Sequence, residues 1–87
     1  MKIDMDNLHT TELGADRIRR NLGLEADDAV AWCKQAILTA GDGAISRKGK
    51  NWYVQCPGCV ITVNVHSTTI ITAHKTKPFL PVTAPRK

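Results

Sequence analysis

The sequence predicts an α+β fold in which two N-terminal helices pack on one face of a four-stranded antiparallel β-meander. Apolar residues recur with helical spacing in the first 41 positions and alternate every second residue from position 44 onward. Turn-forming pairs recur at short intervals in the second half, at Lys48-Gly49, Pro57-Gly58 and His66-Ser67. We therefore expect one domain over residues 1–75, followed by a poorly ordered, basic, proline-containing tail over residues 76–87.

The first helix is predicted to run from Thr10 or Thr11 to Leu22. A threonine can cap its N-terminus, Glu12 lies in its first turn, and Gly23 follows its last turn. The spacing places four of its side chains in one stripe along the helix. That stripe consists of Thr11, Ala15, Ile18 and Leu22.

The second helix is predicted to begin near Asp27 and to end at Gly41. Acidic residues around its start favour the positive end of the helix dipole, and a glycine is a common stop signal. Its buried stripe would comprise Ala29, Val30, Cys33, Ala36, Ile37 and Ala40. Cys33 is therefore interpreted as a small core residue.

Four strands are predicted at about 44–47, 52–56, 59–65 and 69–74. If Cys56 lies opposite Cys59 across the Pro57-Gly58 turn, one face of the sheet becomes apolar and packs against the helices. In this register the pairs Val54–Ile61 and Trp52–Val63 belong to that face. The opposite, open face then carries Tyr53, Gln55, Val60, Thr62 and Asn64.

The length of the last loop decides where Thr72 and His74 point. A three-residue loop places Val63 opposite Ile71 and Thr62 opposite Thr72, which brings Thr72 and His74 onto the open face. A two- or four-residue loop would turn them toward the helices. With the three-residue loop, the predicted core comprises Ile18, Leu22, Val30, Cys33, Ile37, Trp52, Val54, Ile61, Val63 and Ile71.

Charge is divided unevenly between the two halves of the chain. Residues 1–43 contain all eight acidic residues and five basic ones, whereas residues 44–87 contain seven basic residues and no acidic one. A basic surface of this kind favours RNA or an acidic protein surface as the partner.

No apolar stretch is long enough to span a membrane and the N-terminus lacks the features of a signal peptide, so we expect a cytoplasmic protein.

The string Cys56-Pro57-Gly58-Cys59 allows three interpretations. It can form a structural turn, half of a zinc site, or a pair for thiol–disulfide exchange. Zinc would require two further ligands, and a redox pair normally lies at a helix N-terminus. We predict a structural turn with no metal and no cofactor, and the other two uses remain alternatives.

RNA cleavage by the 2′-hydroxyl requires a base, an acid and cationic groups near the phosphate. His9 and His74 are the candidates for acid–base roles, with Thr72 in support. A basic turn leading into aromatic residues can grip phosphate and stack a base. The candidate nucleic-acid contacts are Arg17, Arg20, Arg47, Lys48, Lys50, Tyr53 and Lys75.

Three strings resemble a family of small, functionally uncharacterised bacterial proteins. They are the run from His9 to Gly14, the run from Lys48 to Tyr53, and the run from Ile70 to Lys75. The layout is also similar to the RelE/ParE-like toxins, a superfamily of small ribonucleases. This second resemblance implies a toxin-type, metal-independent endoribonuclease with a cognate antitoxin or host-factor partner. The alternative is a non-enzymatic interaction protein or inhibitor that binds an acidic protein surface.

Overall fold

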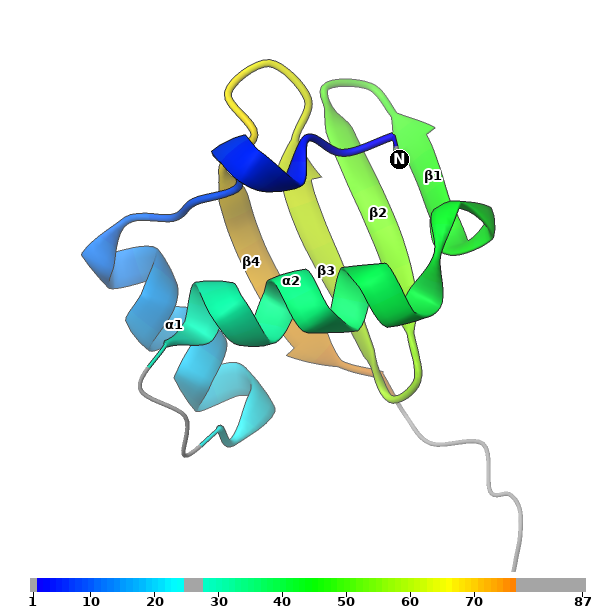
Figure 1. Ribbon diagram of the computed structural model, residues 1–87. Coiled ribbons are helices and arrows are strands. Elements are labelled where there is room, and N and C mark those ends of the chain that lie inside the picture. Colours follow the sequence, from blue (N-terminus) through cyan, green and yellow to red (C-terminus); the bar gives the residue numbers. More distant parts are fainter. Residues whose placement is uncertain (1, 25–27, 77–87) are drawn as a thin grey trace, which may run out of the picture.

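A computed structural model describes residues 2–24 and 28–76, and it has the predicted architecture. Two helices lie across one face of a four-stranded antiparallel sheet whose strands follow chain order (Figure 1). The helices are α1 (Glu12–Leu22) and α2 (Ala29–Ala40), with short 3-10 turns at Met5–Asn7 and Asp42–Ala44. The strands are β1 (Ile45–Lys48), β2 (Asn51–Cys56), β3 (Cys59–Asn64) and β4 (Ile70–Lys75).

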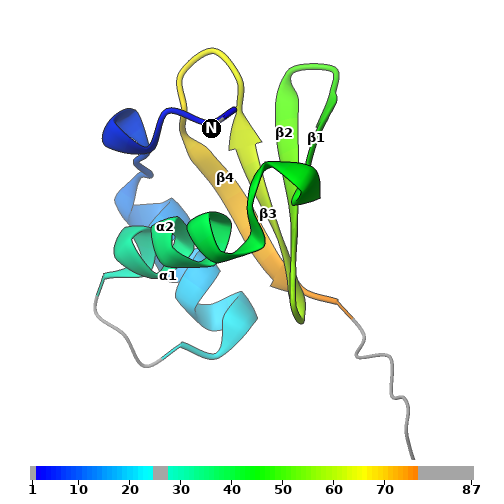
Figure 2. The same ribbon diagram turned by 45° about the vertical axis from the view of Figure 1, so that its right-hand side comes forward.

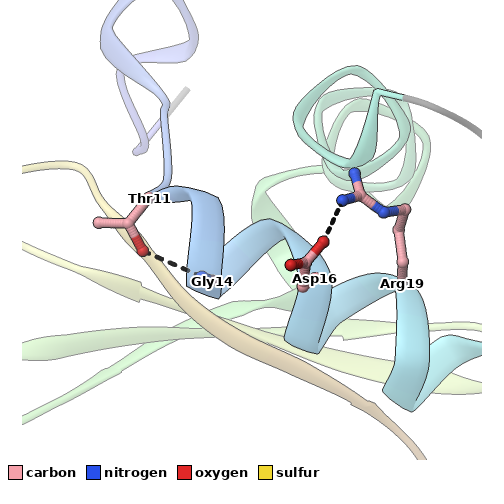
Figure 3. A network of polar contacts seen from close by, with 4 residues as sticks. All are labelled: Thr11, Gly14, Asp16 and Arg19. Atoms are coloured by element: carbon pink, nitrogen blue, oxygen red, sulfur yellow. Dashed lines mark hydrogen bonds and ion pairs between the residues drawn. The ribbon is translucent and has the colours of Figure 1, made fainter.

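Helix α1 begins and ends as the sequence predicts. The Thr11 hydroxyl accepts a hydrogen bond of 3.0 Å from the backbone N–H of Gly14, which caps the N-terminus (Figure 3). Gly23 ends the helix with a φ of 65°, a left-handed conformation that favours glycine. Asp16 and Arg19 form an ion pair one turn apart on the helix surface (Figure 3).

Helix α2 begins two residues later than predicted, because Asp28 serves as the cap. Its carboxylate accepts a hydrogen bond of 3.0 Å from the backbone N–H of Ala31. Asp27, the predicted start, lies outside the described residues. Helix α2 packs on β2 and helix α1 packs on β4, so the two helices cover different parts of the same sheet face (Figures 1 and 2).

The register of the sheet is as predicted except at one residue. The pairs Cys56–Cys59, Val54–Ile61 and Trp52–Val63 are all present. Thr62 pairs with Thr72 as expected, but Val63 pairs with Ile70 because a bulge interrupts the ladder between Thr62 and Val63. The prediction that Ile71 faces Val63 in the core is therefore wrong. Ile70 is 1% exposed and Ile71 is 39% exposed.

The core lies between the helices and the sheet and also includes the N-terminal segment. The buried apolar residues are Ile3, Leu8, Ile18, Leu22, Ala29, Cys33, Ile37, Ile45, Val54, Cys59, Ile61, Val63, Ile70 and Ala73. Two predicted core residues, Val30 and Trp52, are only partly buried at the edge of this cluster. The burial of Ile3 and Leu8 has no counterpart in the sequence prediction, because no helix or strand periodicity marks the first eight residues.

The predicted tail lies outside the described residues except for Thr76. Its backbone N–H donates a hydrogen bond of 3.1 Å to the carbonyl of Gly58, beside the β2–β3 turn. Within residues 2–24 and 28–76, neither helix has the length and apolar character required to cross a membrane.

Candidate functional site

The sheet face that the helices leave uncovered is hollowed beside Tyr53. Figure 2 shows α1 and α2 on one side of the sheet and no described helix on the other. The hollow has a volume of about 510 Å³. It is lined by Ser46, Lys48, Gly49, Tyr53, Gln55 and Val60, which offer one aromatic ring, one ammonium group, a hydroxyl and an amide.

The register brings four of the predicted site residues onto this open face. Ser46 pairs with Tyr53, and Lys48 occupies the same face two residues further along β1. Thr72 lies opposite Thr62, which in turn lies opposite Tyr53. His74 is exposed and pairs with Val60, a residue that lines the hollow. The open face therefore combines Lys48, Tyr53, Thr72 and His74.

Two further predicted cations lie at the β1–β2 turn. The Arg47 side chain points to the helix-facing side, where its guanidinium lies 5.8 Å from the centre of the Trp52 ring. Its Nε also donates a hydrogen bond of 3.2 Å to the carbonyl of Gly49. Lys50 is exposed in the turn. Arg47 is thus held by interactions within the chain, whereas Lys48 and Lys50 extend into solvent.

The remaining predicted cations belong to the helical side of the molecule. Arg17 and Arg20 are exposed on α1. Lys75 lies at the C-terminal end of the same helix, since a Cβ added at Gly23 would be 3.7 Å from its Nζ. An ammonium group at this position complements the negative end of the helix dipole. These three residues are therefore separated from the hollow by the thickness of the sheet.

His9 is the centre of a polar network that links the N-terminal segment to the β3–β4 loop. Its Nδ1 lies 2.7 Å from the carbonyl oxygen of Asn7, which can only accept, so Nδ1 carries the proton. In the neutral ring Nε2 is then an acceptor, and the Thr69 hydroxyl lies 3.1 Å away. The Ser67 hydroxyl lies 2.7 Å from that of Thr69 and 3.2 Å from the side-chain oxygen of Asn64.

The backbone reinforces the same junction. The N–H of His9 donates to the carbonyl of Thr68, and the N–H of Ile70 donates to the carbonyl of His9. Thr68 has a φ of 56°, which is a strained conformation for a β-branched residue. These contacts fasten the segment before α1 to the start of β4, so the network has a structural role whether or not His9 also performs chemistry.

The structure does not bring His9 and His74 together. His9 contacts Thr69, which precedes β4, whereas His74 lies near the other end of that strand. Five residues of extended chain separate Thr69 from His74, which corresponds to roughly 16 Å. The two imidazoles cannot act as acid and base on the same phosphate in this conformation, because such groups must lie within hydrogen-bond reach of it.

The three cysteines gather beneath α2, and none is in a disulfide. Burial, with a smaller effect from Cys59, raises the pKa of Cys33 to about 12. Burial followed by the neighbouring Cys59 thiol likewise raises the pKa of Cys56 to about 12. Burial also raises the pKa of Cys59, although a hydrogen bond from Cys56 opposes this. Among the described residues, no three His, Cys, Asp or Glu side chains are arranged to hold a metal ion.

A second hollow, which we call the thiol groove, opens beside these cysteines. It has a volume of about 320 Å³ and is mainly apolar. It is lined by Trp32, Gln35, Ala36, Thr39, Cys56, Pro57 and Cys59. The thiol groove lies on the helix-facing side, so it is separate from the hollow beside Tyr53.

Sequence reasoning missed several residues of these sites. The sequence prediction places Gln55 on the open face without a role in ligand contact, although an amide near a half-buried aromatic residue is a usable signal. The sequence prediction places Ser67 in the last loop and Thr69 at the start of the last strand, and it gives neither residue a functional role. Their proximity to His9 depends on contacts between residues 60 positions apart, for which the sequence gives no periodic signal.

Comparison with known proteins places the chain in an uncharacterised family. Residues 3–74 match the family described as protein of unknown function (DUF3781), and the chain belongs to that family. No curated protein and no solved structure matches the chain significantly. The expected membership of a small uncharacterised family is confirmed, and the family brings no activity with it.

Proposed function

We propose that this protein binds single-stranded RNA on the open face of its sheet. The observation that carries the proposal is the hollow beside Tyr53, where an accessible aromatic ring adjoins an ammonium group and no carboxylate belongs to any strand. Aromatic side chains on an uncovered sheet can stack unpaired bases, and nearby cations attract the backbone. The similarity in layout to RelE-like ribonucleases is a second, weaker reason to test RNA first.

The residues around the hollow suggest separate roles in binding. The Tyr53 ring would stack against a base, and the Gln55 amide and the Ser46 hydroxyl would hydrogen-bond to its edge. Lys48 would contact the phosphate on one side of that base. Thr72 and His74 extend the same face toward β4 and would meet the next nucleotides along the strand.

The proposal is binding rather than cleavage. A toxin-type endoribonuclease would need its acid and base near a single phosphate, and His9 and His74 lie at opposite ends of β4. Each of these residues can still be tested independently for a role in cleavage. RNA that remains intact after prolonged incubation with the protein in EDTA would agree with binding alone.

Titration of a fluorescently labelled single-stranded RNA, followed by anisotropy, tests the proposal. Tyr53→Ala should weaken binding by about 1–3 kcal/mol, equivalent to roughly 5- to 150-fold in Kd, because one stacked base is lost. Tyr53→Phe is the matched control, since it keeps the ring and removes only the hydroxyl, and it should retain most of the affinity.

Two results would contradict the proposal. One is the absence of salt-sensitive binding to any single-stranded RNA, because phosphate contacts always release counterions. The other is equal affinity in the wild-type, Tyr53→Ala and Tyr53→Phe proteins, which would place any RNA elsewhere. Circular dichroism of each variant checks that the fold is retained.

A protein partner is the second candidate, and exposed apolar side chains favour it. Leu13 on α1, Leu38 on α2 and Ile71 at the bulge of β4 are all exposed large hydrophobic residues. An interaction protein of this kind could use the basic sheet for an acidic surface and these residues for apolar contacts. A partner that co-purifies after nuclease treatment, and that is lost in Leu38→Ser but not in Tyr53→Ala, would support this candidate over RNA.

A further inference from the structure

We propose that Cys56 and Cys59 form a thiol–disulfide exchange site whose substrate is a low-molecular-weight disulfide entering the thiol groove. This site is independent of the proposed RNA face, because the two cysteine side chains point to the helix-facing side of the sheet. It also uses the one chemical string in the sequence that the binding proposal leaves unexplained.

The strand pairing places the two cysteines where a disulfide between them is possible. Cys56 and Cys59 are direct cross-strand partners on either side of the Pro57-Gly58 turn. Directly opposed residues of an antiparallel pair have Cα atoms about 4.5–5.5 Å apart, which falls within the range of about 4.4–6.8 Å seen in disulfides. The Cys56 thiol donates a hydrogen bond of 3.8 Å to the carbonyl of Ala36 on α2, so its sulfur faces the helix side, as the sulfur of its partner Cys59 does. Closing the bond therefore requires little movement of the backbone.

The different burial of the two thiols assigns their order of reaction. Cys56 is partly exposed and lines the thiol groove, so it is the thiol that an incoming disulfide meets first. Cys59 also lines the groove but is only 3% exposed, which assigns it the role of the resolving thiol. Cys33 is completely buried on α2 and is not among the residues that line the groove.

The groove itself suits a small molecule better than a protein chain. Its volume of about 320 Å³ is at the lower end of the range found for small-molecule sites. Trp32, Ala36 and Pro57 give it apolar walls, and Gln35 and Thr39 add hydrogen-bonding groups at the rim. Glutathione disulfide is a small molecule with a central disulfide and peptide-like ends that can form hydrogen bonds. It serves as the probe.

The exchange occurs in two balanced steps. The Cys56 thiolate attacks one sulfur of glutathione disulfide, forming a mixed disulfide and releasing one glutathione thiolate, which takes up a proton. The Cys59 thiolate then attacks the Cys56 sulfur, forming the internal disulfide and releasing the second glutathione. The protein dithiol is oxidised, the glutathione disulfide is reduced to two thiols, and two protons pass from the cysteines to glutathione.

The raised pKa values determine the rate of the exchange. Only the thiolate is nucleophilic, and burial keeps both Cys56 and Cys59 mainly protonated near neutral pH. Exchange should therefore be slow at neutral pH and should accelerate by roughly tenfold for each pH unit, as the thiolate fraction rises. This behaviour is typical of a slowly modified site and differs from that of an oxidoreductase with an activated cysteine.

Intact-mass analysis and peptide mapping of the full, reduced protein incubated with glutathione disulfide test the proposal. The wild type should acquire a Cys56–Cys59 disulfide and retain no glutathione. Cys59→Ala should trap glutathione on Cys56, and Cys56→Ala should leave Cys59 unmodified. Cys33→Ala is the matched control, since it removes the third thiol of the same cluster and should still give the Cys56–Cys59 disulfide with no glutathione retained.

Three outcomes would overturn the proposal. The first is a native protein that stays reduced under conditions in which the urea-unfolded chain is oxidised. The second is a stable mixed disulfide on Cys56 in the wild type, which would show that Cys59 does not resolve it. The third is a disulfide that includes Cys33. Circular dichroism of the alanine variants shows whether each remains folded, and the wild-type mapping decides the question without them.

Discussion

The helical layer and the sheet layer use charge in different ways. In the helical layer, which we define as residues 2–24 and 28–42, several acidic side chains have structural partners within the chain. Asp28 caps α2, Asp16 pairs with Arg19, and Asp42 accepts a hydrogen bond from the backbone of Lys2. In the sheet layer, residues 44–76, there are cations and no acidic residue.

This difference supports the proposal that RNA binds to the sheet layer. A carboxylate that caps a helix or pairs with a neighbouring arginine contributes to folding, and its removal mainly changes stability. A cation on a strand contributes little to folding when its own layer contains no carboxylate with which it could pair. Lys48 is of the second kind, and it lies beside the hollow at Tyr53. The two layers should therefore respond differently to substitution.

The largest expected change in stability is at the bulge of β4, where the sheet layer meets the helical layer. Ile70→Ala should destabilise the protein by about 2–5 kcal/mol, because it removes a fully buried side chain and leaves a cavity. Ile71→Ala, one residue further on, should cost less than about 1 kcal/mol, since that side chain is exposed. Urea unfolding measures both. Equal losses, or a greater loss at Ile71, would mean that the bulge is misplaced.

The same bulge marks the limit of what the sequence could predict. Helical spacing and end signals were sufficient for both helices, and alternation and turn signals for all four strands and the pairing of β2 with β3. The adjacent Ile70 and Ile71 are chemically equivalent, so alternation alone could not decide which one faces the core. A single extra residue exchanges their environments, and the pattern contains no signal for it.

The candidate site was predicted in part for a similar reason. Tyr53, Thr72 and His74 share a face because of strand register, which is a local property that the sequence encodes. The contact of His9 with Thr69 and the position of Lys75 beside Gly23 depend instead on how distant segments pack. Spacing along the chain carries no information on such contacts, so the separation of His9 from His74 could not be foreseen.

A second prediction concerns the thiols between the layers at alkaline pH. The pKa of Cys33 is raised from its ordinary value of 9.0 to about 12 in the folded protein, mainly by burial. Between these values the unfolded chain loses a proton that the folded protein keeps, so stability is fully present below pH 9 and falls as the pH rises toward 12.

Urea unfolding at about pH 8 and about pH 10 measures this loss. Cys33→Ala should be less stable at the lower pH because of its smaller side chain, but its stability should decline less between the two pH values. Lysine and tyrosine ionisation is common to both proteins and cancels in the comparison. A decline of equal size in the two proteins would show that Cys33 does not contribute.

A third prediction tests the helical layer through its caps. Thr11→Ala should destabilise the protein by about 1 kcal/mol, because the backbone N–H of Gly14 loses its acceptor (Figure 3). Thr11→Ser keeps the hydroxyl and is the matched control, with an expected change of a few tenths of a kcal/mol. Thermal unfolding of the two variants distinguishes loss of the cap from loss of the methyl group. If the serine variant were as unstable as the alanine variant, the cap would not explain the effect.

The smallest expected effect on stability gives the sharpest contrast between the layers. Lys48→Ala and Arg17→Ala each remove one exposed cation, from the open face and from α1 respectively, and each should change stability by no more than about 0.5 kcal/mol.

The effects of these two substitutions on RNA binding should differ. If Lys48 contacts a phosphate, its removal should lower the slope of log affinity against log salt by about 0.7–1, whereas Arg17→Ala should leave that slope unchanged. Anisotropy titrations at several salt concentrations measure the slope for each protein. Equal reductions in both variants would indicate a diffuse attraction to the whole basic molecule, and a reduction in Arg17→Ala alone would move the RNA to the helical layer.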